Sequence, residues 1–257
     1  MALMLLKTFR SKVAESGKRK LFIIPYLFTF SNAIFGFFSI IKALEGNFVW
    51  ASWFILFAAV MDMFDGRLAR AIGSCSYLGM ELDSLCDAIS FCLAPVILLY
   101  VWKFYAFGIV GLIILSFYLC CGLLRLAKYN SITAKQDNDI GFFVGMPTPL
   151  AALMVAQMVI YYPWIIARVL PFMQYPLGLM SVIFILSILM ISPIYFLSFK
   201  KISSKRSIVG GFLASTLLIF GFFKGIPFLF LGIFSYIISC ILYYVYSNIY
   251  YRHKGLS

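Results

Sequence analysis

The feature that most constrains this chain is a series of apolar runs, each long enough to cross a lipid bilayer. A transmembrane helix needs about 20 consecutive, mainly apolar residues. Such runs recur at 22–44, 48–66, 84–102, 104–127, 147–166, 177–198, 208–223 and 226–247. Only 12% of the residues are charged and the mean hydropathy is +1.01, which is typical of a membrane protein and not of a soluble domain. The sequence therefore predicts an all-α integral membrane protein, a polytopic bundle of about eight transmembrane helices.

The positions of the basic residues predict how the bundle is oriented. Of the 21 Lys and Arg residues, 17 fall on one side of the predicted membrane. Because loops rich in Lys and Arg remain on the cytoplasmic side, we expect both termini there. This orientation fits a bacterial inner membrane. The formal net charge of +12 then favours attraction to anionic membrane lipid. No nucleic-acid-binding motif is present, so nucleic acid is not an expected partner.

Three segments follow from the distribution of charge and hydropathy. Residues 1–21 form a basic N-terminal segment beside the membrane, with apolar residues at helical spacing. They could lie in the interface as an amphipathic helix, or form a disordered basic start. Residues 22–198 form the main predicted membrane domain. Residues 199–257 add a C-terminal transmembrane hairpin and tail without any acidic residue, which suggests a scaffold or the surface of a possible homodimer.

The acidic residues gather in one short stretch, residues 61–90, which holds five of the nine in the chain. Asp62 and Asp65 are three residues apart, and Asp83 and Asp87 are four apart. On helices, each spacing brings two carboxylates to one face. Glycine and serine residues between the pairs indicate a break in the helix. We therefore expect two neighbouring helices, joined by a short cytoplasmic turn, whose four carboxylates converge.

Such a cluster needs a compensating positive charge, because carboxylates near hydrocarbon are costly to bury. Carboxylate-rich sites suit hard divalent cations such as Mg²⁺, Mn²⁺ or Ca²⁺. Two such ions, about 3.5–4 Å apart, would clamp a phosphoryl group, and Arg67 and Arg70 could bind its oxygens. Two alternatives are salt bridges to these arginines and the ion site of a polytopic cation transporter. The position of the carboxylates at a helix boundary, away from the membrane midplane, disfavours the transporter.

The full spacing of this stretch resembles a known signature. The pattern Asp62-x₂-Asp65-Gly66-x₂-Ala69-Arg70-x₈-Gly79-x₃-Asp83-x₃-Asp87 matches every fixed position of the signature of CDP-alcohol phosphatidyltransferases. Those integral membrane enzymes transfer a phosphatidyl or related group from a CDP-linked donor to an alcohol and release CMP. The resemblance implies two bound Mg²⁺ or Mn²⁺ ions on the four aspartates, with Asp87 also placed to take the proton of the acceptor hydroxyl.

The resemblance also implies a set of residues that bind the CDP group. The opening run "IPYLFTFSNAIFGFFSI" is similar to the first helix of the phosphatidylserine synthases within the family. Thr29 and Asn32 lie three residues apart on that helix, so both could point at the nucleotide, or could form helix–helix hydrogen bonds inside the bundle. The signature does not require Ser74. The predicted CDP-binding residues are Thr29, Asn32, Gly66, Ala69, Arg70, Ser74 and Gly79.

Three further segments indicate the acceptor alcohol. The stretches "ELDSLCDAISFCLAP", "CGLLRLAKYN" and "FFVGMPTP" resemble segments of the phosphatidylserine synthases. The resemblance implies transfer from CDP-diacylglycerol to L-serine; glycerol 3-phosphate, inositol phosphate or choline are the alternative acceptors. Arg125 could bind the serine carboxylate or only anchor the end of its helix, and Lys128 and Lys135 are further candidates. The polar segment 128–149 could recognise the acceptor or be a connector.

Overall fold

The computed structural model describes residues 26–72, 77–133, 142–197 and 228–253. Four sequence predictions lie outside the described residues: the basic segment 1–21, Ser74, Lys135 and the apolar run 208–223.

The first two helices form an antiparallel pair. The first helix spans Tyr26–Leu44, and α2 spans Phe48–Ile72. Gly46 lies between them with φ of +78°, a value that favours glycine. The side chain of Asn47 accepts a hydrogen bond from the backbone N–H of Trp50, which caps the start of α2. The pair returns the chain to the side from which the first helix began.

The next stretch is continuously helical from α3 to α4. It consists of α3 (Tyr77–Asp87), the π-helical turn η1 (Ala88–Leu93) and α4 (Ala94–Trp102). Pro95 has no N–H to donate to residue 91, which lies within the π-helical turn. Turns of this kind are frequent at functional sites, and this one begins directly after Asp87.

The chain then turns back through a short 3₁₀ helix, η2 (Phe104–Phe107), into α5 (Gly108–Thr133). After strand β1 (Phe142–Val144) come α6 (Thr148–Ile160), α7 (Tyr162–Arg168), the 3₁₀ helix η3 (Pro171–Gln174) and α8 (Pro176–Ile191). Strand β2 (Tyr195–Leu197) pairs antiparallel with β1, and α10 spans Phe228–His253.

The predicted number of about eight spans is not confirmed. Within the described residues, four helices are long and apolar enough to cross a membrane, or five if the bent pair α6 and α7 forms one span. These two helices meet at 89°, and Pro163 lies at the bend. The run 177–198 was predicted as one span, but α8 ends at Ile191, before Pro193. The short β1–β2 pair is a further departure from a purely helical fold.

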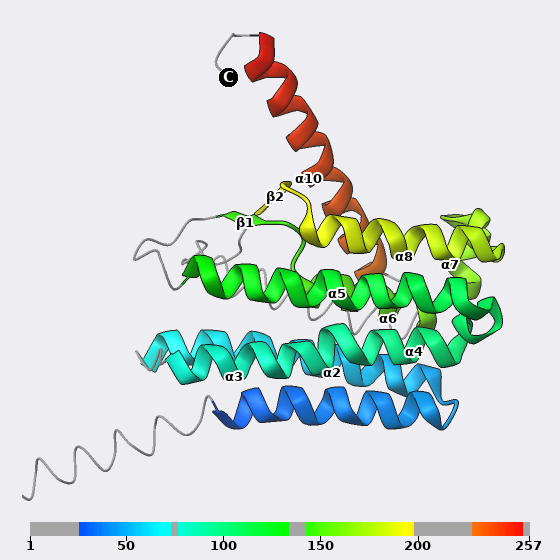
Figure 1. The fold of residues 1–257 in the computed structure, drawn as a ribbon, viewed down its shortest axis with the longest axis horizontal. Helices are drawn as coiled ribbons and strands as arrows, with labels where there is room; N and C mark the ends of the chain where they lie inside the picture. Colours follow the sequence, from blue (N-terminus) through cyan, green and yellow to red (C-terminus); the bar gives the residue numbers. More distant parts are fainter. Residues whose placement is uncertain (1–25, 73–76, 134–141, 198–227, 254–257) are drawn as a thin grey trace, which may run out of the picture.

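The long helices form a bundle, and one of its ends carries the acidic residues. Figure 1 shows the first helix, α4, α5 and α8 running roughly parallel, while α10 crosses them obliquely. The packing of α5 against α8 and of α2 against α6 builds the interior. α2 runs toward this end and α3 starts from it, so Asp62 in the second half of α2 and Asp83 and Asp87 in the second half of α3 come together.

Candidate active site

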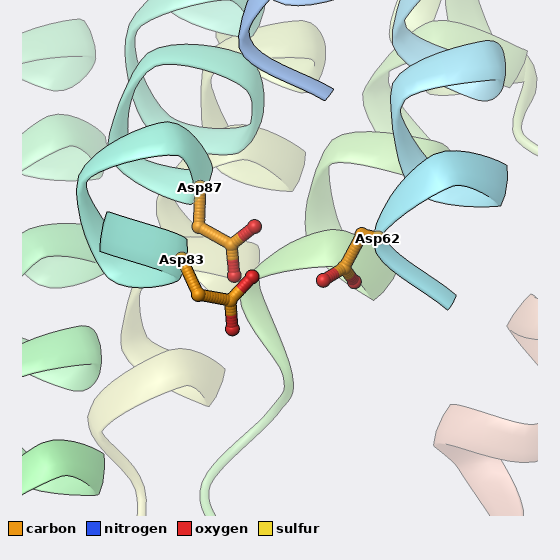
Figure 2. A group of neighbouring side chains, drawn as sticks. All are labelled: Asp62, Asp83 and Asp87. Carbon is orange, nitrogen blue, oxygen red and sulfur yellow. The ribbon is translucent and has the colours of Figure 1, made fainter. Parts of the chain in front are cut away.

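Three of the four predicted metal ligands come together. One carboxylate oxygen from each of Asp62, Asp83 and Asp87 lies within 4.8 Å of the others. Figure 2 shows the carboxylates of Asp83 and Asp87, both on α3, facing Asp62 on α2. Asp87 is buried, with 7% of its surface exposed, while Asp62 and Asp83 are half-buried. The predicted convergence of two helices is thus present for these three residues.

The fourth aspartate, Asp65, is not a member of this group. It is 6% exposed, and its Oδ2 accepts a hydrogen bond from the Thr29 hydroxyl of the first helix. Asp65 follows Asp62 by three residues, so its side chain is turned about 60° around the axis of α2. That rotation directs it toward the first helix.

Asn32, one turn after Thr29, makes the corresponding contact with α3. Its Nδ2 donates to Oδ1 of Asp87 at 2.9 Å, and its side chain is fully buried. The Ser90 hydroxyl, in the π-helical turn, donates to the backbone carbonyl of Asn32 at 2.9 Å. Thr29 and Asn32 therefore form interhelical hydrogen bonds, and their partners are carboxylates. Their role as nucleotide contacts stays a prediction.

Arg125 of α5 lies beside the acidic group. It interacts electrostatically with Asp87 and with Asp62. Its Nη1 donates to Oγ1 of Thr148 at 3.2 Å, and its guanidinium carbon lies 5.4 Å from the centre of the Tyr129 ring. A cation held in this way next to the carboxylates could bind an anionic group of a substrate.

The segment directly before Thr148 is held by contacts with the end of α8 and the residues that follow it. The N–H of Gly145 donates to the carbonyl of Ile194, and the N–H of Met146 donates to the carbonyl of Leu189, both at 2.9 Å. Gly145 has φ of +83°, and a Cβ there would lie 2.3 Å from the carbonyl oxygen of Met190. Only glycine fits this close approach without strain.

The remaining predicted residues lie in several places. Gly66 is exposed, and within the part of the chain that the structure describes a Cβ there would meet no atom within 4 Å, which leaves room for a ligand beside the helix. Ala69 and Arg70 belong to the last turns of α2 and Gly79 to the first turn of α3, at the same end of the bundle. Lys128 is exposed on the last turns of α5.

Sequence reasoning missed four polar residues that contact the site or lie beside it. Ser90 binds the carbonyl of Asn32, and Thr148 binds Arg125. The hydroxyl of Ser84, next to Asp83, donates to Oδ1 of Asn130 at 3.0 Å, which ties α3 to α5. A signal was present, because Thr148 and Asn130 lie within the segments "FFVGMPTP" and "CGLLRLAKYN" that resemble family segments.

The donor set of the acidic group fits a hard divalent cation. Three carboxylates at this distance repel one another, and their oxygens are the ligands that Mg²⁺ and Mn²⁺ prefer. Asp62, Asp83 and Asp87 would hold such an ion. When bound, a divalent cation stabilises the negative charge of a phosphoryl group that is being transferred.

Comparison with known proteins assigns the chain to a family of enzymes. The family model described as CDP-alcohol phosphatidyltransferase matches residues 22–191, which contain all the carboxylates above.

Individual relatives match a large part of the chain. The CDP-diacylglycerol–serine O-phosphatidyltransferase of Helicobacter pylori is 34% identical over 185 residues, 71% of this chain and 75% of that protein. The protein of the same name from Bacillus subtilis is 34% identical over 178 residues, 69% of this chain and 92% of that protein. The one from Saccharomyces cerevisiae is 35% identical over 155 residues, 56% of this chain and 55% of that protein.

Proposed function

The chain belongs to the CDP-alcohol phosphatidyltransferase family, and we propose that it transfers a phosphatidyl group from CDP-diacylglycerol to the hydroxyl of L-serine. The products are phosphatidylserine and CMP. The observation that carries the proposal is the convergence of Asp62, Asp83 and Asp87 inside the segment that the family model matches. The choice of serine is supported by the shared name of the relatives from Helicobacter pylori and Bacillus subtilis.

The proposed reaction is a displacement at the β-phosphorus, which bears the diacylglycerol. The serine hydroxyl oxygen bonds to that phosphorus, and the bond to the oxygen bridging the two phosphates breaks. CMP leaves with the bridging oxygen, and Asp87 takes the hydroxyl proton as general base. Asn32 engages Oδ1 of Asp87, so the proton transfer is assigned to the other carboxylate oxygen.

Charged and small residues around the carboxylates would bind the two substrates. Arg125 binds the serine carboxylate, since its planar guanidinium suits a carboxylate and it lies beside Asp87. Lys128, exposed on α5, contributes positive charge, and Lys135, ten residues after Arg125 in the sequence, is a further candidate. The CDP group lies along the end of α2 and the start of α3, where Gly66 leaves space beside the helix.

The membrane setting follows from the charge asymmetry of the sequence. The apolar helices and the family make the chain a membrane protein. The excess of Lys and Arg on one side supports a cytoplasmic active site and a bacterial inner-membrane location.

Three further proposals complete the function. Residues 22–198 serve as the catalytic domain. Two Mg²⁺ or Mn²⁺ ions would be held by the aspartates, and the proposed assembly is a homodimer.

Release of CMP by the purified full chain tests the proposal. With CDP-diacylglycerol and Mn²⁺, addition of L-serine should produce CMP and phosphatidylserine in equal amounts. Glycerol 3-phosphate, inositol phosphate and choline serve as competing acceptors. Release with one of these but not with serine would contradict the acceptor and leave the family assignment intact. No release with any acceptor would contradict the proposed transfer.

A further inference from the structure

The first helix presents a line of small and polar residues to the bundle interior. Thr29, Asn32, Gly36 and Ser39 follow one another at intervals of three and four residues, so they share one helix face. All four are buried, and the side chains of Asn32 and Ser39 are fully so. Yet only the first two contact carboxylates in the part of the chain that the structure describes.

These two contacts reach different helices. Thr29 donates to Asp65, 36 residues later on α2, and Asn32 donates to Asp87, 55 residues later on α3. The first helix therefore bridges the two helices that supply the acidic residues. A third hydrogen bond, from Ser90 to the carbonyl of Asn32, fixes the first helix against the turn that follows Asp87.

Close packing fixes the position of the first helix against the π-helical turn. A Cβ at Gly36 would lie 2.3 Å from Oγ of Ser90 and 2.8 Å from its Cα. The first helix and the π-helical turn are thus in direct backbone contact one turn beyond Asn32. Asn32 can consequently reach Asp87 with a short side chain.

We propose that Thr29 and Asn32 are positioning residues: Asn32 orients Asp87 for the cation held by Asp62, Asp83 and Asp87, and Thr29 orients Asp65, which lies outside that group, for the second of the two proposed cations. Without a donor on each side chain, neighbouring carboxylates of equal charge would rotate apart. The inference rests on the proposed metal dependence, but it concerns residues of the first helix, outside the acidic stretch. Groups that orient metal ligands through hydrogen bonds typically change metal affinity by about 10–100-fold when they are removed.

Binding of Mn²⁺ to the purified full chain, without CDP-diacylglycerol or serine, tests the proposal. Free Mn²⁺ is measured by electron paramagnetic resonance while the metal is titrated. We expect Thr29→Val, which removes the hydroxyl and keeps the shape, to weaken binding by about 10–100-fold. Asn32→Leu should have a similar effect. Thr29→Ser restores the hydroxyl and should bind Mn²⁺ nearly as the wild type does.

Ser39→Ala is the matched control, because it changes a buried polar residue on the same helix face that contacts no carboxylate in the described residues. It should leave Mn²⁺ affinity unchanged. Thermal unfolding in EDTA is recorded for each variant. A lower unfolding temperature with unchanged Mn²⁺ affinity in Thr29→Val would mean that the first helix only packs, and would overturn the proposal.

The outcomes also separate this inference from the proposed function. If Asn32→Leu does not fold, the Mn²⁺ affinity of Thr29→Val tests the proposal alone, because this variant removes the hydrogen bond to Asp65. A wild-type chain that binds no Mn²⁺ would refute both the metal site and the positioning role. Normal Mn²⁺ binding in every variant would refute only the positioning role. A chain that binds Mn²⁺ as expected but transfers nothing to serine would refute only the acceptor.

Discussion

Replacing Gly145 by alanine should destabilise the protein and impair serine recognition. The φ of +83° at this position costs a residue with a Cβ about 1–2 kcal/mol. The new Cβ would also lie 2.3 Å from the backbone carbonyl oxygen of Met190, which no side-chain rotation can relieve. Overpacking of this kind costs about 1–3 kcal/mol, so the total loss in free energy of unfolding is about 2–5 kcal/mol.

A second glycine separates the two contributions. Gly46 has nearly the same φ, +78°, but a Cβ there would meet no atom of the described residues within 4 Å. Gly46→Ala should therefore lose only about 1–2 kcal/mol. Titration with SDS in mixed micelles measures both free energies of unfolding. Equal losses in the two variants would refute the clash with Met190 as the reason for glycine at 145.

The effect on activity follows from the short distance along the chain to Thr148. The shift needed to admit the Cβ would move Thr148, which accepts the hydrogen bond from Arg125. KM for serine should then rise more in Gly145→Ala than KM for CDP-diacylglycerol. A parallel rise in both constants would show that the segment supports the whole site and not the acceptor alone.

Four further outcomes test the proposed chemistry. Asp83→Ala should abolish CMP release without unfolding the bundle, since Asp83 is half-buried and packs no core; near-normal activity would contradict its role as a metal ligand. Asp87→Asn should retain binding of CDP-diacylglycerol, measured with labelled donor, but lose turnover, because the amide cannot accept the proton; equal loss of both would remove the separate base role. Arg125→Ala should raise KM for serine by about 10–100-fold, the value of a charge-assisted hydrogen bond, whereas an unchanged KM would exclude it as the carboxylate site. EDTA should stop the reaction, and Mg²⁺ or Mn²⁺ but not Zn²⁺ should restore it; full activity in chelator would contradict metal dependence.

The acidic group was predictable because helical periodicity is a local property. Asp83 and Asp87 are four residues apart, about 40° around the helix axis, and the structure holds them together. Asp62 and Asp65 are three apart, about 60°, and the structure separates them. Spacing alone could not show whether the Asp65 carboxylate joins the other three, because that depends on the position of the first helix.

The number of spans was less predictable, because hydropathy treats proline as a tolerated residue within a run. Pro163 and Pro193 are visible in the sequence, and each lies where a predicted span bends or ends. Proline bends or ends a helix because it has no backbone N–H to donate, and the hydropathy of a run carries no information about backbone hydrogen bonds. The contacts of Thr29 and Asn32 connect residues 36 and 55 positions apart, beyond the reach of any local pattern.

Two sets of contacts hold the site, one from the first helix and one that links Gly145 to Arg125. Mutations in the two sets should have independent effects on activity, with one exception. Thr29 contacts Asp65, whereas Gly145 acts on Arg125 through Thr148, so these two sets of contacts share no residue. The losses in transition-state stabilisation from Thr29→Val and Gly145→Ala, calculated from kcat/KM for serine, should therefore add within about 0.3–0.5 kcal/mol.

Asn32 differs, because it contacts Asp87, which interacts electrostatically with Arg125. Asn32→Leu combined with Gly145→Ala should depart from additivity by about 0.5–3 kcal/mol. Since both pairs contain the same Gly145→Ala change, any general weakening of the bundle would affect them alike. Additive losses in both pairs would mean that Arg125 and Asp87 do not act together on the acceptor, and would contradict the assignment of the serine carboxylate to Arg125.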